Sequence, residues 1–217
     1  MEIYATIVRF FQEGGLFMYP IVLVFAIGAA IALERFMYIS ASRARNKKVW
    51  NQLKPLLQQG NYQRAMAVTS TSKAAIGKIL TYGLSRVKSA RNRDDIEKAM
   101  EESLMEVMPS LEKRTHYLAT FANIATLLGL LGTIIGLIKA FTAVAAANPA
   151  EKADLLSASI SVAMNTTAFG LMVAIPLLLM HTVLQTKTNE LLDSLEMASV
   201  KFLNSISERG GSVKGTA

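Results

Sequence analysis

The chain has 217 residues, of which 52% are hydrophobic and 18% are charged, and its formal net charge is +7. This composition is too apolar for an average soluble domain, yet it keeps a sizeable polar part. With no cysteine and only two histidines, which lie far apart, the sequence argues against disulfides, thiolate chemistry and a protein-only zinc site. We therefore expect a membrane protein without a metal or an organic cofactor.

Three long stretches, residues 14–33, 115–138 and 155–186, contain no Asp, Glu, Lys or Arg. Each exceeds the ~18 residues at which an apolar stretch is read as a membrane-spanning helix. The sequence therefore predicts an all-α polytopic membrane protein, with three transmembrane helices that cytoplasmic helices extend. The predicted spans are residues 14–39, 117–147 and 157–186.

The segments outside the spans have their own patterns. Residues 1–13 place most apolar side chains on one side of a helix, which predicts an amphipathic helix at the periplasmic interface. Residues 187–217 are expected to form a cytoplasmic helix and then a flexible tail, because three glycines occur after Glu208.

Charge asymmetry predicts the orientation of the spans. The long loop, residues 40–116, holds fifteen Lys and Arg against seven acids, whereas the short loop, residues 148–156, holds one Lys and two acids. The positive-inside rule then places the long loop and the C-terminus in the cytoplasm, and the short loop and the N-terminus in the periplasm. Nucleic-acid binding is not expected, because aromatic residues are sparse among the basic ones.

The long loop has helical patterns. Asn61 is placed to cap one short helix, and Ser72 a second. A third, starting near Asp94, has apolar residues at steps of three and four that lead toward the second span. We expect one long helix to run from the cytoplasm into the membrane, with a kink at Pro109.

Small residues recur at helical spacing in the second and third spans. Such stripes allow two helices to approach closely, and a proline in the third span is expected to bend or loosen its helix. The predicted packing positions are Gly129, Gly132, Gly136, Ala163, Gly170 and Pro176.

Polar side chains inside the spans have two interpretations. Their hydroxyls and amide could simply join helices, since Ser and Thr can bond to the carbonyl four residues earlier. Alternatively, they line an ion passage, which their clustering beside small residues favours. The candidate pore-lining residues are Thr126, Thr133, Asn165, Thr166 and Thr167.

Two ionisable residues near the predicted cytoplasmic ends of the spans are candidates for a proton exit path. Glu34 directly follows the first uncharged stretch, and His181 is an ionisable side chain near the end of the third. The simpler interpretation places both at the membrane interface, as anchors.

Two motifs resemble those of the MotA/TolQ/ExbB proton channel family. They are GLLGTIIGLIKAF at residues 129–141 and ISVAMNTTAFGLMVAIP at residues 160–176. Three spans, a basic loop after the first and a short loop after the second are similar to the ExbB and TolQ branch, so the resemblance covers nearly the whole chain. In these motifs Thr133 and Thr167 correspond to the family's pore-facing threonines, whereas Val162 stands where ExbB and TolQ have a glutamate.

The resemblance implies a homopentamer in the bacterial inner membrane. The ring would enclose single-span helices of an ExbD- or TolR-like partner, in two copies, and that partner would carry the membrane aspartate. Its periplasmic part would transmit force to a TonB- or TolA-like protein or to the cell wall. The implied function is that of a proton-channel or stator subunit that converts proton motive force into mechanical work.

The residues themselves lead to the same requirement for a second protein. One charge that crosses 100 mV yields ~2.3 kcal/mol, and hydroxyls do not change charge at physiological pH. The titrating group must therefore come from another subunit. The alternative function is a passive membrane scaffold that contacts lipid. The coupled ion is expected to be the proton, with sodium as the other candidate. The sequence contains no pattern of a nucleophile with a nearby base, so we do not expect an enzyme.

Overall fold

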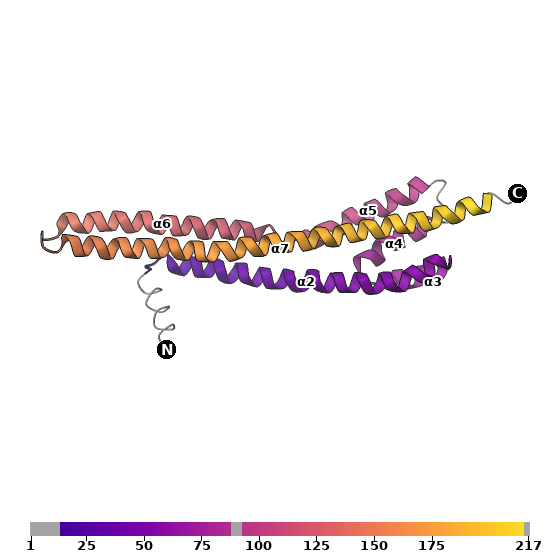
Figure 1. Ribbon diagram of the computed structural model, residues 1–217, viewed down its shortest axis with the longest axis horizontal. Coiled ribbons are helices and arrows are strands. Elements are labelled where there is room, and N and C mark those ends of the chain that lie inside the picture. The colour runs from indigo at the N-terminus through magenta and orange to yellow at the C-terminus, as the bar shows by residue number, and fades with distance from the viewer. Residues whose placement is uncertain (1–13, 88–92, 215–217) are drawn as a thin grey trace, which may run out of the picture. The chain divides into compact units, whose positions relative to one another are not determined.

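The computed structural model describes residues 14–87 and 93–214, with side chains as far as residue 207. Its regular elements are helices, and the described part contains no strand. These helices are α2 (Met18–Gln58), α3 (Tyr62–Ser70), α4 (Ala75–Arg86), α5 (Arg93–Glu112), α6 (Tyr117–Ala146) and α7 (Lys152–Lys214) (Figure 1). The predicted interfacial helix over residues 1–13 lies outside the described residues.

The all-α class is confirmed. Among the described residues, three helical stretches are long and apolar enough to cross a membrane, and they include α2, α6 and α7. Helix α7 continues through Pro176 and remains helical as far as Lys214, beyond Glu208, where we expected a flexible tail to begin.

The chain divides into two compact units. One, here called the membrane unit, contains the residues up to Glu34 together with Arg114–Val183. The other, here called the loop unit, contains Arg35–Lys113 together with the residues from Leu184 onward. Helices α2 and α7 each contribute to both units.

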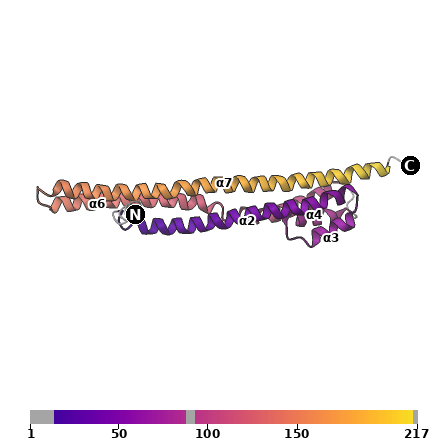
Figure 2. The same cartoon turned by 60° about the horizontal axis from the view of Figure 1, so that its bottom comes forward.

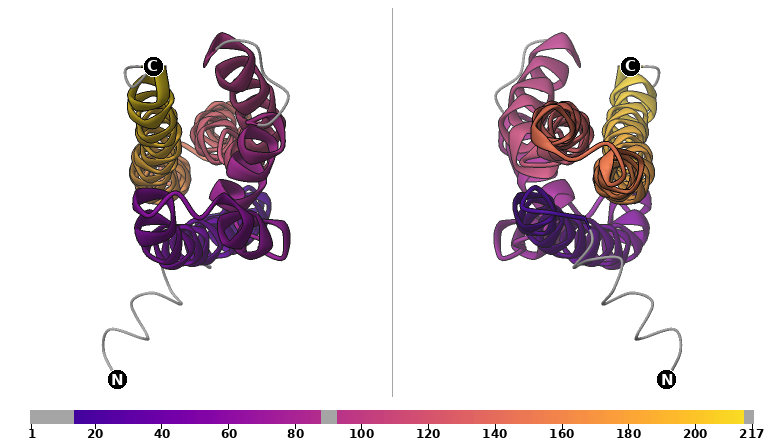
Figure 3. Two further views of the ribbon diagram at one scale, coloured as in Figure 1. Left: turned by 90° about the vertical axis from the view of Figure 1, so that its right-hand side faces the viewer. Right: turned by 90° about the vertical axis from the view of Figure 1, so that its left-hand side faces the viewer.

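In the membrane unit, α6 and α7 run side by side in opposite directions (Figures 1 and 3). The turn between them includes a hydrogen bond from the Glu151 N–H to the Asn148 carbonyl, 3.0 Å long. Small side chains dominate the buried positions of the two helices, because a close approach of backbones leaves room for little else. These buried positions include Ala122, Ala125, Ala140 and Ala163.

The loop unit is a small helical bundle with a conventional apolar core. Helix α4 packs against both α3 and α5, and Figure 2 shows α3 beside α4. The amphipathic stripes expected from the sequence are buried there, as helices of a soluble bundle require. Fully buried core residues include Leu53, Ile79, Leu80, Met100, Leu191 and Phe202.

Helices α3 and α4 begin in different ways. The Asn61 side chain accepts a hydrogen bond from the Arg64 N–H at 3.2 Å, so the predicted cap of α3 is confirmed. Helix α4 begins after Ala74, and Ser72 accepts only from the Ala74 N–H. The first turn of α4 is capped instead by Asn46 of α2, whose Oδ1 accepts from the Ile76 N–H at 3.2 Å.

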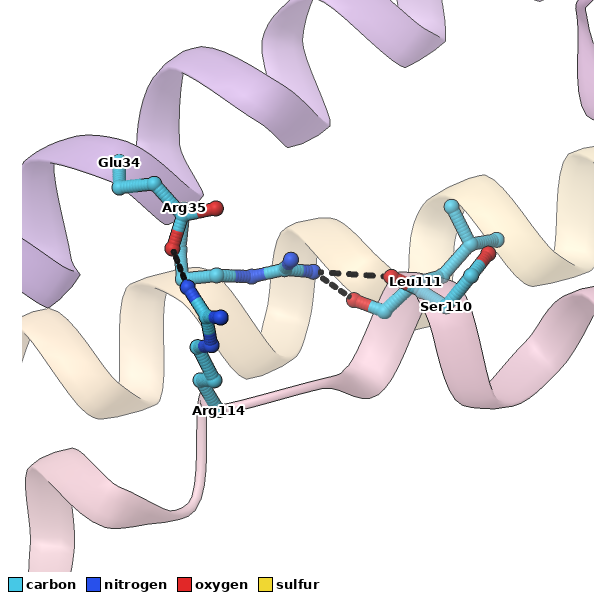
Figure 4. Close-up of polar contacts among 5 residues, drawn as sticks. All are labelled: Glu34, Arg35, Ser110, Leu111 and Arg114. Carbon is cyan, nitrogen blue, oxygen red and sulfur yellow. Dashed lines mark hydrogen bonds and ion pairs between the residues drawn. The ribbon is translucent and has the colours of Figure 1, made fainter.

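The expected continuous helix with a kink at Pro109 is wrong. Pro109 lies inside α5, which ends at Glu112, and the chain turns before α6 begins at Tyr117. Arg114 has a φ of 65° in this turn, the left-handed conformation that commonly ends a helix. The last carbonyls of α5 bind the buried Arg35 side chain, whose Nη2 donates to Ser110 and Leu111 (Figure 4).

The Arg114→Gly variant should be more stable than the Arg114→Ala variant. Both substitutions remove the ion pair with Glu34, but only glycine adopts a positive φ without steric cost. We expect Arg114→Gly to exceed Arg114→Ala in unfolding free energy by about 1 kcal/mol. Thermal unfolding of both variants in detergent measures the difference, and equal midpoints would show that the turn imposes no such strain.

Candidate functional site

The candidate site lies where α6 and α7 approach most closely in the membrane unit. A Cβ placed on Gly129 would lie 3.3 Å from Gly170 Cα, and one on Gly170 would lie 2.7 Å from the Ala125 carbonyl oxygen. Gly136 faces Ala163 in the same way, at 3.0 Å. The predicted small-residue stripes of the two spans therefore face each other within one chain.

This approach brings two hydroxyls together. Thr133 of α6 and Thr167 of α7 share a hydrogen bond through their Oγ1 atoms. The Thr133 hydroxyl also lies 3.2 Å from the carbonyl oxygens of Gly129 and Ala163, and the Thr167 hydroxyl lies 3.0 Å from the Gly129 carbonyl. Both side chains are half-buried. The structure thus joins the two threonines across the helix pair.

The hydrogen-bond capacity of this cluster is asymmetric. Each hydroxyl has one proton to donate and two lone pairs that can accept, whereas a carbonyl oxygen only accepts. Once a hydroxyl donates to a carbonyl, its lone pairs remain as acceptors for an O–H from outside. If the hydroxyl rotates, its proton becomes available to an anion. The pair can therefore receive either form of a carboxyl group without becoming charged itself.

Thr166 has a different environment. It is 2% exposed, and its hydroxyl donates to the Gly14 carbonyl at 2.6 Å, with the Val162 carbonyl also within reach at 2.9 Å. Its methyl group would collide with a side chain at Gly132. We expected Thr166 to line the pore, but the structure places it in the packed interior, where it fixes the segment before α2 against α7.

Thr126 and Asn165 do not join the hydroxyl pair. Thr126 is exposed, and its hydroxyl donates to the Ala122 carbonyl of its own helix at 3.1 Å. Asn165 is half-buried on α7, and its amide makes no hydrogen bond within the described part of the chain. An amide in a membrane-length helix needs a partner, since water is absent there.

The two candidate proton-exit residues, Glu34 and His181, have different surroundings. The Glu34 carboxylate pairs with Arg114 at 3.5 Å, and both side chains are nearly half exposed (Figure 4). His181 is half-buried on α7. Pro176 and Val162 also lie on α7, where Val162 would come within 3.3 Å of a Cβ on Gly15.

Sequence reasoning missed the backbone acceptors of the site. The Gly129 carbonyl oxygen lies within hydrogen-bond distance of the Thr133 and Thr167 hydroxyls, and the Gly14 carbonyl accepts from the Thr166 hydroxyl. Glycine spacing did predict that helices meet near Gly129. The sequence carries no signal for which carbonyl a hydroxyl selects, because that depends on how the two helices are rotated.

Gly170→Ala should separate α6 from α7, whereas Gly28→Ala should be tolerated. The new methyl at Gly170 meets backbone, which cannot move aside, but at Gly28 it meets the flexible end of Leu177. Overpacking of this kind costs about 1–3 kcal/mol, and we expect that range for Gly170→Ala. Thermal unfolding in detergent compares the two variants, and equal loss in both would contradict the close approach.

Comparisons with known proteins are consistent with this architecture. Residues 71–197 match the model of the MotA/TolQ/ExbB proton channel family. A protein named as an ExbB homolog in Methanothermobacter thermautotrophicus is 28% identical over 199 residues, which are 91% of this chain and 69% of the relative.

Two bacterial relatives match shorter parts. The Tol-Pal system protein TolQ of Haemophilus influenzae is 34% identical over 92 residues, 42% of this chain and 40% of the relative. The biopolymer transport protein ExbB of Aquifex aeolicus is 30% identical over 111 residues, 51% of this chain and 72% of the relative. The family match covers more than half of the chain and contains both threonines of the site. This multi-pass membrane protein therefore belongs to the MotA/TolQ/ExbB proton channel family.

Proposed function

We propose that this chain is the channel-forming subunit of a proton-driven complex in the bacterial inner membrane, and that Thr133 and Thr167 line its ion path. The observation that carries the proposal is the hydroxyl pair between two membrane-length helices of a proton channel family member. In this arrangement, the subunits form a pentameric ring, and the threonine pair of each subunit faces the centre.

The proton carrier comes from a partner with a single membrane span. Residues 115–138 and 155–186 contain no carboxylate, so the walls around the pair offer no acidic side chain that could carry the proton. An aspartate on an ExbD- or TolR-like helix, present in two copies, supplies that group. Its charge change in the membrane field is worth ~2.3 kcal/mol per 100 mV, which is the energy available for motion.

The hydroxyl pair serves both states of that aspartate. A protonated carboxyl donates its O–H to a threonine lone pair, and an ionised carboxylate accepts a hydroxyl proton after the threonine rotates away from its carbonyl. Because hydrogen bonds to charged groups contribute about 1.5–3 kcal/mol, the pair lowers the cost of an anion inside the membrane without trapping it as a fixed cation would.

Asn165 and the loop charges support the assembly and its orientation. An amide without a hydrogen-bond partner among the described residues favours contact with a neighbouring subunit, with the partner helix or with pore water. The excess of basic residues in the loop, residues 40–116, supports a cytoplasmic position for it under the positive-inside rule. On the periplasmic side, the partner transmits force to a TonB- or TolA-like protein or to the cell wall. Glu34 and His181 are the proposed exit residues.

A passive scaffold is the second candidate function. The observation in its favour is that each threonine hydroxyl already lies within hydrogen-bond distance of carbonyls in its own chain. In a scaffold these bonds only join α6 to α7, and interhelical bonds of this kind contribute about 0.6–2 kcal/mol. The two functions differ in whether proton flux depends on the hydroxyls.

Thr167→Val and Thr133→Val should reduce proton flux about tenfold or more, since 1.5–3 kcal/mol of anion stabilisation is lost. Thr167→Ser and Thr133→Ser, which keep the hydroxyl, should retain most of the flux. The complex is purified with its copurifying partner, and flux is followed with a pH-sensitive dye in proteoliposomes. Thr142→Val is the matched control, because Thr142 is exposed and, among the described residues, its hydroxyl bonds only to the Ile138 carbonyl of its own helix. Wild-type flux in both Val variants would favour the scaffold.

The Asn165→Leu variant should show whether Asn165 faces an assembled pore or only lipid. If the amide contacts another subunit or pore water, its removal should lower proton flux or weaken the ring seen by native mass spectrometry. In contact with lipid alone, leucine should stabilise the protein, because the unpaired amide is costly there. Met164→Leu, at an exposed apolar position beside it, controls for the change in packing. A more stable protein with full flux would exclude the proposed contact.

A further inference from the structure

A cavity in the loop unit has features of an anion site that the proton path does not use. It has a volume of about 280 Å³ and lies between α2 and α7, beside the first turn of α4. The charged side chains that line it are all basic. The lining residues that matter here are Arg43, Asn46, Lys47 and Trp50 of α2, Ile76 of α4 and Lys201 of α7.

Asn46 is the most informative of these residues. It is 4% exposed, and its Oδ1 accepts the hydrogen bond from the Ile76 N–H. Since that N–H needs an oxygen, the amide cannot be turned over, and Nδ2 must occupy the other position. Nδ2 is buried, with no hydrogen-bond partner in the described part of the chain. A buried donor without an acceptor costs about 1–3 kcal/mol, so an acceptor atom is missing beside Asn46, one of the residues that line the cavity.

The charges around the cavity indicate what should carry that acceptor. Arg43 is paired with Glu190 at 2.9 Å. Lys47 and Lys201 are exposed, and neither forms an ion pair with a described residue. The N-terminal end of α4, with its positive dipole, is adjacent through Ile76. Two ammonium groups, an amide N–H and a helix N-terminus together favour an oxyanion with several acceptor oxygens.

We propose that this cavity binds a phosphate group, with Asn46 Nδ2, Lys47 and Lys201 as its donors. The half-buried Trp50 provides an apolar wall for whatever the phosphate is attached to. Inorganic phosphate or a soluble phosphate ester, and the headgroup of an anionic lipid, share this chemistry. Occupancy would tie α2, α4 and α7 of the loop unit together, since each contributes to the site.

Two substitutions test the site without removing the cap of α4. Asn46→Asp keeps an oxygen for the Ile76 N–H but replaces the Nδ2 donor by a charged oxygen. Lys201→Ala removes one exposed cation from the opposite helix. Each should weaken phosphate binding about tenfold or more, because a charge-assisted contact is lost. Lys54→Ala, an exposed lysine of α2 outside the cavity, should bind as the wild type does.

The full chain in its purified complex is measured in two arms. In phosphatidylcholine nanodiscs, inorganic phosphate is titrated calorimetrically. In nanodiscs that contain phosphatidylglycerol and no added phosphate, retained lipid is counted by native mass spectrometry. Weakening by both variants in either arm supports the site, and the arm that responds identifies the source. Equal binding by the wild type and both variants, or no saturable binding in either arm, overturns it. If Asn46→Asp lowers the thermal midpoint, Lys201→Ala alone decides.

Discussion

The close approach of α6 and α7 is the constraint on which the membrane unit depends. Gly129 and Gly170 leave no space for a Cβ, so the two backbones lie within van der Waals contact. At that separation, a threonine on one helix reaches a carbonyl on the other, and the two hydroxyls reach each other. With larger residues at the glycines, Thr133 and Thr167 could bond only within their own helices. The glycines therefore create the polar cluster, although they contribute no polar side chain.

The absence of Asp and Glu from residues 115–138 and 155–186 fits the close contact between α6 and α7. A carboxylate at the helix contact would be buried among carbonyl oxygens, which cannot donate hydrogen bonds, and its pKa would rise until it became neutral. Hydroxyls tolerate this environment because they donate to carbonyls and still accept from elsewhere. This chemistry supports the arrangement proposed above, in which this chain would provide the uncharged wall and a separate helix would provide the group that changes charge.

The sequence predicted the parts of this protein that depend on periodicity. Three uncharged stretches identified the membrane-length helices, glycine spacing identified the face where α6 meets α7, and Asn61 marked the start of α3. The predictions from the sequence that were wrong concern contacts between residues far apart in the chain. The break before α6 occurs beyond Pro109, in a turn where Arg114 is left-handed and Arg35 binds the end of α5. A helix pattern cannot reveal a terminus that a residue of another helix stabilises.

Thr166 shows the same limit inside the site. It lies directly beside Thr167 and has the same chemistry, so the sequence gives no reason to separate them. A difference of one residue rotates a side chain by about 100° around the helix. That rotation turns Thr166 toward Gly14 and Gly132, in the packed interior, and leaves Thr167 at the partly open contact with Thr133. Of these adjacent hydroxyls, one is therefore buried in the packed interior while the other stays half-buried at the helix contact, and only the direction of the helix face distinguishes them.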